Sequence, residues 1–275
     1  MRNWAVHVRR YGSSEDIVVV LHGGPAAAGD AAPIARGLSD SFTAIEPWQR
    51  GSGEMPLTVS RHVEDLHSLI QGLALDSPPA IVGHSWGAML ALCHAAEYPN
   101  DAGPIVLVGC GTFDRPSRDR MKAILEERTD SRLRQRLAEI DESTRDPGEL
   151  HMTKYKLTRD LSVYDRMKPW PDREEYEPLD ARAHKETWDD MLRLEADGTY
   201  PAAFSRIRSR VLMLHGDYDP HPGAMIRDSL RPFVRELEYR ELARCGHSPW
   251  LERSARDEFF SAMKRWLRAG RASRG

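Results

Sequence analysis

The chain has few cysteines, no long apolar run and little net charge, and each of these shortages excludes a class of protein. Three cysteines among 275 residues form no disulfide framework and show no metal-ligand spacing. A net charge of −3 gives no basis for binding nucleic acid or an anionic membrane surface. No apolar run approaches the length of a membrane span, and the first residues lack a signal-peptide pattern. We therefore predict a cytoplasmic protein with no membrane span, no cofactor and no bound metal.

Short apolar runs alternate with segments of helical periodicity along much of the chain. Strands are predicted over residues 4–10, 18–21, 41–46, 79–82, 105–108, 211–214 and 237–242. Strands that alternate with helices imply a mostly parallel, doubly wound sheet of the α/β class. The length suits one such domain with an insertion.

Residues 112–204 differ from the rest of the chain. They are rich in arginine, glutamate and aspartate, they contain no strand-like run, and their apolar residues recur at helical spacing. We therefore predict an α/β core formed by residues 1–111 and 205–275, with residues 112–204 inserted as a helical cap.

Residues 83–87, Gly-His-Ser-Trp-Gly, lie between a predicted strand and a predicted helix. Glycine at both ends of this motif allows a tight, strained turn in which a Cβ atom would clash. Such a turn lifts the Ser85 hydroxyl above the sheet, at the start of the following helix. We predict that Ser85 is a nucleophile. The alternative is a structural serine in an ordinary turn.

Three further motifs follow predicted strands in a consistent order. His-Gly-Gly-Pro at 22–25 precedes the serine, and Gly-Asp-Tyr-Asp at 216–219 and Gly-His-Ser at 246–248 come after it. A serine needs a base within hydrogen-bond reach and backbone donors for the developing oxyanion. We predict His247 as the base, Asp219 as the acid that orients it, and the N–H groups of Gly24 and Trp86 as the oxyanion hole.

Several alternatives to these residues remain open. Asp217 or Asp114 can replace Asp219 as the acid, although Asp217 is also suited to capping its loop. His84 lies next to the serine, and its side chain is expected to point away from the site.

The order of oxyanion loop, serine, acid and histidine resembles that of the α/β-hydrolase superfamily, over nearly the whole chain. The resemblance implies the α/β-hydrolase fold with an inserted helical cap. Residues 22–25, Gln-Arg-Gly at 49–51 and Ser-Trp-Gly at 85–87 resemble the motifs of the proline iminopeptidase group. The chain departs from that group at Ala26, where the group has glycine, and at Trp48, where it has aspartate.

This second resemblance implies an aminopeptidase that holds the substrate's N-terminal ammonium with carboxylates of the cap. Glu174, Glu175 and Trp188 are the predicted substrate-binding residues. The alternatives are a solvated helix face for the glutamates and core packing for the tryptophan.

The leading hypothesis is a cofactor-free serine hydrolase that forms an acyl-enzyme on Ser85 and acts on a small molecule or short peptide. A carboxylesterase, lipid-ester hydrolase or carbon–carbon bond hydrolase is the alternative, because one triad serves all of them. A ligand-binding receptor on the same fold is the alternative of another class. The sequence does not predict an oligomeric state.

Overall fold

The computed structural model describes residues 7–143, 146–168 and 179–272. Its strands form one sheet in the order β1-β3-β2-β4-β5-β6-β7. Only β1 is antiparallel to its neighbour, β3, and every other pairing is parallel. The strands are β1 (Val8–Tyr11), β2 (Ile17–Leu21), β3 (Thr43–Pro47), β4 (Ala80–His84), β5 (Ile105–Val108), β6 (Val211–Gly216) and β7 (Leu237–Leu242). The predicted mostly parallel sheet is confirmed, although the start of the strand predicted over 4–10 lies outside the described residues.

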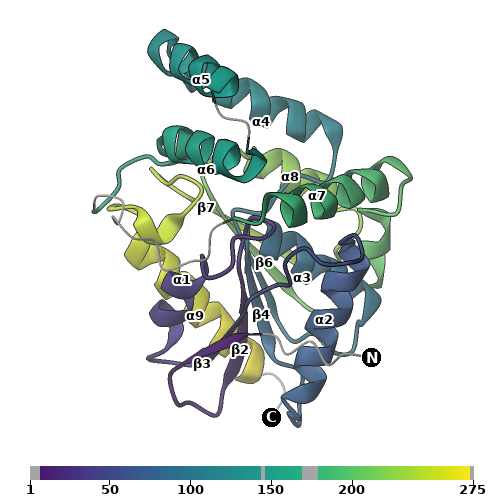
Figure 1. Ribbon diagram of the computed structural model, residues 1–275. Coiled ribbons are helices and arrows are strands. Elements are labelled where there is room, and N and C mark those ends of the chain that lie inside the picture. The colour runs from purple at the N-terminus through teal and green to yellow at the C-terminus, as the bar shows by residue number, and fades with distance from the viewer. Residues whose placement is uncertain (1–6, 144–145, 169–178, 273–275) are drawn as a thin grey trace.

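Helices cover both faces of this sheet (Figure 1). On one face lie α1 (Ala32–Leu38) and α9 (Arg256–Ala272), whose apolar residues share a core cluster with β2 and β6. On the other face lie α2 (Val59–Gly72), α3 (Trp86–Glu97) and α8 (Gly223–Leu230), which form a second cluster. Because β2, β4 and β5 are buried on both faces, their sequences are nearly continuous apolar runs.

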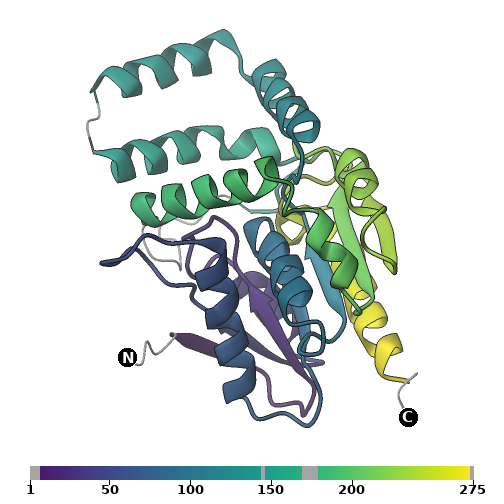
Figure 2. The same ribbon diagram turned by 90° about the vertical axis from the view of Figure 1, so that its right-hand side faces the viewer.

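Between β5 and β6 the chain forms α4 (Arg115–Arg128), α5 (Ser131–Ser143), α6 (Pro147–Thr158) and α7 (Ala181–Ala196), which we call the inserted helices. Figure 1 shows α6 and α7 across one end of the sheet, and Figure 2 shows α7, α6 and α5 stacked outward from it. Short 3₁₀ helices η1 (Arg159–Ser162), η2 (Ala202–Arg206) and η3 (Pro249–Leu251) connect the other elements. No helix in the described parts of the chain is both long and apolar enough to cross a membrane.

Helix α7 is attached to the core through side chains that cap the start of α2. Glu186 accepts a hydrogen bond from the Leu57 N–H at 2.8 Å, and Asp190 accepts one from the Val59 N–H at 2.8 Å. Val59 is the first residue of α2, where N–H groups lack partners within the helix and carboxylates are favoured, and Leu57 lies two residues before it. The inserted helices are therefore fixed to the core through α7.

Three buried histidines of the core make the fold sensitive to acid. Burial lowers the pKa of His62 to about 3 and that of His22 and His94 to about 4. In the unfolded chain these side chains titrate near pH 6.5, so between about pH 6.5 and 4 the unfolded chain binds more protons than the folded one. The free energy of unfolding therefore falls as the pH falls through this window. We expect urea denaturation to show a loss of about 1–2 kcal/mol per histidine between pH 7.5 and pH 5.

His94 offers a control for this prediction, because neither of its ring nitrogens has a hydrogen-bond partner among the described residues. His94→Leu should keep the apolar packing and remove about a third of the pH dependence that the three histidines produce. The pKa of His215 is raised, because the effect of Asp219 exceeds that of burial, and this side chain opposes the trend. An unfolding free energy that is equal at both pH values would contradict the expectation.

Candidate functional site

Ser85 occupies a strained turn between β4 and α3. Its φ and ψ angles are 54° and −116°, a conformation that side-chain-bearing residues rarely adopt. A Cβ atom on Gly83 would lie 2.2 Å from the Gly87 carbonyl oxygen, and one on Gly87 would lie 2.4 Å from the Leu21 carbonyl oxygen. Both glycines are therefore required by close backbone approach, as the motif predicts.

His247 and Asp219 meet beside this turn, brought together from the ends of β7 and β6. The His247 Nδ1–H donates to the Asp219 Oδ2 at 2.8 Å, and the carboxylate of Asp219 is fully buried. The His247 backbone N–H in turn donates to the Ser162 carbonyl at 2.8 Å, which fixes the loop that carries the ring. The hydrogen bond between Nδ1 and Asp219 orients the ring and leaves Nε2 as the atom that can accept a proton.

The two alternative acids have other contacts. Asp217 accepts a hydrogen bond from the Cys245 N–H at 3.0 Å, as a loop-capping residue does. Asp114 caps α4 and accepts from the Ser117 N–H at 2.7 Å. Of these three aspartates, only Asp219 contacts His247.

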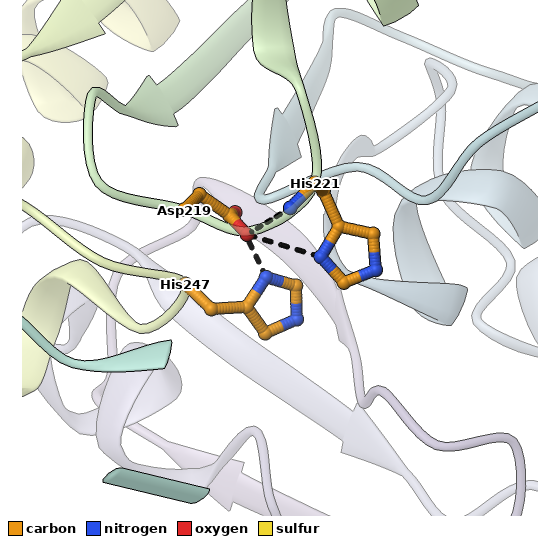
Figure 3. A group of neighbouring side chains, drawn as sticks. All are labelled: Asp219, His221 and His247. Carbon is orange, nitrogen blue, oxygen red and sulfur yellow. Dashed lines mark hydrogen bonds and ion pairs between the residues drawn. The ribbon is translucent and has the colours of Figure 1, made fainter. Parts of the chain in front are cut away.

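Sequence reasoning did not identify two more histidines around the Asp219 carboxylate. His221 donates to Oδ1 from its backbone N–H at 2.9 Å and from its ring Nδ1–H at 3.0 Å, and its ring stacks on His247 with centroids 4.5 Å apart (Figure 3). The buried His215 Nε2 lies 3.2 Å from Oδ2. Burial would raise the pKa of Asp219, but His247, His215 and His221 outweigh it and hold the pKa well below its usual value. The carboxylate is therefore ionised at neutral pH.

Asp219, His221 and His247 also form a group whose ligand atoms lie within 4.8 Å of one another, as a divalent cation requires. The two ring Nδ1 atoms face the carboxylate oxygens at hydrogen-bond distance (Figure 3). Two N–H groups that share one carboxylate account for this arrangement without a metal ion.

The predicted oxyanion loop is held by a network that also reaches the elbow. Gly24 has a φ angle of +116°, and a Cβ atom there would lie 2.6 Å from the Ala27 nitrogen. His22 Nε2 accepts from the Gln49 N–H at 3.0 Å, and the Gln49 Oε1 accepts from the Trp86 indole N–H at 2.7 Å. Because burial lowers the pKa of His22 to about 4, the ring is neutral and Nε2 can accept. The network links Trp86 to His22, which lies two residues before Gly24 in the oxyanion loop.

Ser85, Gly24 and His247 line one cavity of about 200 Å³ between the core and the inserted helices. Its other lining residues are Ala27, Asp30, His84, His151, Met152, Tyr155, Leu179, His184 and Ser248. The rings of His151 and His184, from α6 and α7, lie with centroids 4.7 Å apart. Burial lowers the pKa of His184 to about 4, so this ring is neutral at neutral pH.

His84 lies in this cavity, so the expectation that its side chain points away from the site is wrong. Its Nδ1 lies 3.4 Å from the Asp30 carboxylate, and its Nε2 lies 3.2 Å from the His247 carbonyl oxygen. The contacts come from loops distant in sequence, and the turn at Ser85 places His84 among them. Asp30 and His84 are therefore further residues of the site that the sequence did not indicate.

The predicted substrate-binding residues do not meet in the described cavity. Glu174 and Glu175 lie outside the described residues. Trp188 packs against the core cluster under α7 and does not line the cavity, so core packing replaces the predicted substrate contact. It lies three residues before the buried Met191, so the two side chains share the face of α7 that meets the core.

The strained turn at Ser85 and the Asp219–His247 pair thus lie at one end of a mostly parallel sheet, and comparison with known proteins agrees with this fold. Residues 18–262 match the model of the alpha/beta hydrolase family, and the chain belongs to this family. Two curated relatives are cis-3-alkyl-4-alkyloxetan-2-one decarboxylases, from Shewanella oneidensis (28% identical) and Xanthomonas campestris pv. campestris (26% identical). These alignments cover 40% and 38% of the chain and only 37% and 39% of the relatives.

Solved structures share the fold over nearly the whole chain. VinJ is 18% identical, with a TM-score of 0.68 over 95% of this chain and 94% of VinJ. A thermophilic esterase from Thermogutta terrifontis is 18% identical, with a TM-score of 0.63 over 96% and 93% of the two chains. An esterase from Exiguobacterium antarcticum is 19% identical, with a TM-score of 0.61 over 96% and 95%. At these identities the likeness concerns the fold, and the iminopeptidase-like branch stays a prediction.

Proposed function

We propose that this protein is a serine hydrolase that cleaves carboxylic esters through an acyl-enzyme on Ser85. The observation that supports this most is the 2.8 Å hydrogen bond between His247 Nδ1 and Asp219, on a histidine that shares a cavity with Ser85. With Nδ1 engaged, Nε2 remains to take the serine proton. The inserted helices, which supply four residues of the cavity lining, then act as its cap.

The reaction proceeds in two halves. Ser85 Oγ attacks the ester carbonyl carbon while its proton passes to His247 Nε2, and the N–H groups of Gly24 and Trp86 donate to the oxyanion. The bond from the carbonyl carbon to the alcohol oxygen breaks, and the His247 proton goes to that oxygen. Water then gives a proton to His247 and attacks the acyl carbon. The bond from that carbon to Ser85 Oγ breaks, the acid leaves, and the His247 proton returns to Oγ.

Two observations favour an ester over a peptide. A buried substrate ammonium needs carboxylate partners. Among the described residues that line the cavity, Asp30 is the one carboxylate, and it already contacts His84, so the cavity is poorly suited to an ammonium. The relatives' names contain an oxetan-2-one, which is a four-membered cyclic ester. The bond proposed to be cleaved here is therefore of the same class as the one in the oxetan-2-one ring.

An aminopeptidase that removes small N-terminal residues is the second candidate, and Asp30 is the observation that favours it. Burial would raise the pKa of Asp30, but the His84 ring outweighs this effect and lowers the pKa. An ionised carboxylate in the cavity can pair with an ammonium.

The two candidates are separated by substrates that share one leaving-group skeleton. We expect a fluorophosphonate probe to label Ser85, and 2-naphthyl butyrate to be cleaved at least about 100-fold faster, by kcat/KM, than prolyl or alanyl 2-naphthylamide. The reverse ranking, together with a selective loss of naphthylamide cleavage in Asp30→Asn, would establish the aminopeptidase. Ligand binding with no labelling and no turnover of either substrate would instead indicate a receptor.

A further inference from the structure

A second cavity, of about 360 Å³, lies between α4, the end of α6 and η1, and we call it the α4–η1 cavity. Its apolar lining consists of Leu125, Leu161 and Val163, and charged side chains, including Lys122 and Glu126, also line it. Tyr155, His247 and Ser248 line this cavity and also the cavity that contains Ser85. The two cavities therefore meet at the histidine of the site.

The residues of the proposed reaction are distributed unequally between the two cavities. Gly24 and Ser85 line the first cavity only, whereas His247 lines both. During acyl transfer the carbonyl group must lie between the serine and the oxyanion donors, whereas the leaving oxygen must face the histidine that protonates it. The acyl group therefore extends into the first cavity, and the leaving group extends past His247 toward the second.

The boundary between the cavities is fixed by the backbone. The His247 N–H donates to the carbonyl oxygen of Ser162, which is the last residue of η1. The Arg128 side chain, from α4, donates to the carbonyl of Leu161 in the same 3₁₀ helix. The loop of His247 and the wall of the α4–η1 cavity are therefore held together, so a group in this cavity lies at a defined place relative to the ring.

We propose that the α4–η1 cavity binds the alcohol part of the ester, and that this alcohol has an apolar body that contacts Leu125, Leu161 and Val163. The proposal rests on the proposed ester hydrolysis and adds the direction in which the substrate lies. Because the α4–η1 cavity is larger than the cavity beside Ser85, about 360 Å³ against about 200 Å³, the preferred ester joins a short acid to a longer alcohol.

The direct test is a pair of ester series measured on the unmodified protein. One series joins acetic acid to alcohols from ethanol to octanol, and the other joins ethanol to acids from acetic to octanoic. We expect kcat/KM to rise about two- to fourfold per methylene along the alcohol series until the cavity is filled, because each buried methylene leaves water. The acid series should stay level or fall. A rise confined to the acid series overturns the proposal.

Two matched tryptophan variants locate the effect. Leu125→Trp fills the α4–η1 cavity and should lower kcat/KM for octyl acetate at least tenfold while it leaves ethyl acetate within about twofold. Met152→Trp, in the lining of the first cavity, should lower kcat/KM for ethyl butyrate and leave the gain from longer alcohols intact. Urea denaturation checks that both variants fold, and the series on the unmodified protein decides the question if either does not.

Failure of this proposal is distinct from failure of the proposed function. If no ester in either series is hydrolysed by a Ser85-dependent reaction, ester hydrolysis itself is wrong. If esters are hydrolysed and Leu125→Trp changes only the preference for the acid, the reaction stands and the assignment of the α4–η1 cavity is wrong.

Discussion

Replacing Ser85 by alanine is expected to lower kcat for ester hydrolysis about 10⁴- to 10⁶-fold. The replacement removes the only atom that forms the covalent bond in the proposed reaction, and residues of a triad act as a unit, so the other members cannot compensate. Labelling by a fluorophosphonate should disappear with the turnover. Binding of an ester should persist, because the cavity keeps its other lining residues.

Ser60→Ala is the control, since this exposed hydroxyl on α2 donates to Glu64 and does not line the cavity that contains Ser85. We expect its kcat to stay within about threefold. Alanine and serine both carry a Cβ atom, so the positive φ of 54° at position 85 should cost both residues a similar strain, and thermal unfolding should be nearly unchanged in Ser85→Ala. Turnover retained in Ser85→Ala at the level of the Ser60→Ala control would contradict the mechanism.

The sequence predicts the parts of this site that depend on local backbone requirements. Gly83 and Gly87 are needed because the turn brings backbone atoms too close for a Cβ atom. Such a requirement can be predicted from the spacing of the two glycines in the sequence. The same holds for the alternation of apolar runs and helical patterns that predicts the sheet. Strand order brings the carboxyl ends of β4, β6 and β7 to one end of the sheet, so chain order predicts that Ser85, Asp219 and His247 lie close together.

Side chains whose neighbours come from distant segments could not be predicted in this way. The sequence predicts that the His84 side chain points away from the site, but its ring contacts Asp30 and the His247 carbonyl oxygen. His247 lies 163 residues further along the chain. His221 follows a proline in an irregular loop, where no periodicity indicates which way a ring points. Both contacts depend on tertiary packing, which has no local signature.

The inserted helices show the same limit. Their existence follows from apolar periodicity, but a charged helix face does not reveal whether its carboxylates bind a substrate or the protein's own backbone. On α7, Glu186 and Asp190 accept hydrogen bonds from the backbone N–H groups of Leu57 and Val59, which lie 129 and 131 positions away in the chain. These two carboxylates of the inserted helices thus anchor α7 to the core.

Replacing Asp219 by asparagine is expected to lower kcat about 10³- to 10⁴-fold while the fold is kept. Asp219 accepts from His247 on one oxygen and from His221 twice on the other, so both of its oxygens are acceptors in use. Asparagine offers one oxygen and one NH₂ group. If the NH₂ group faces His247, Nδ1 must accept, the proton moves to Nε2, and the ring can no longer take the serine proton. If it faces His221, the negative charge that stabilises the imidazolium is still lost.

Asp217→Asn is the matched control, because Asp217 lies two residues away and an amide oxygen can still accept the hydrogen bond that the Cys245 N–H donates to it. We expect this variant to retain kcat within about threefold, and the rate of fluorophosphonate labelling of Ser85 should separate the two variants in the same way as turnover. The pKa of Asp219 lies well below its usual value, so its ionisation should not contribute to the pH dependence of kcat between pH 5 and 8. Equal losses in the two asparagine variants would mean that the β6–α8 loop matters only structurally, and His247 would then have to act without the carboxylate that its Nδ1–H contacts.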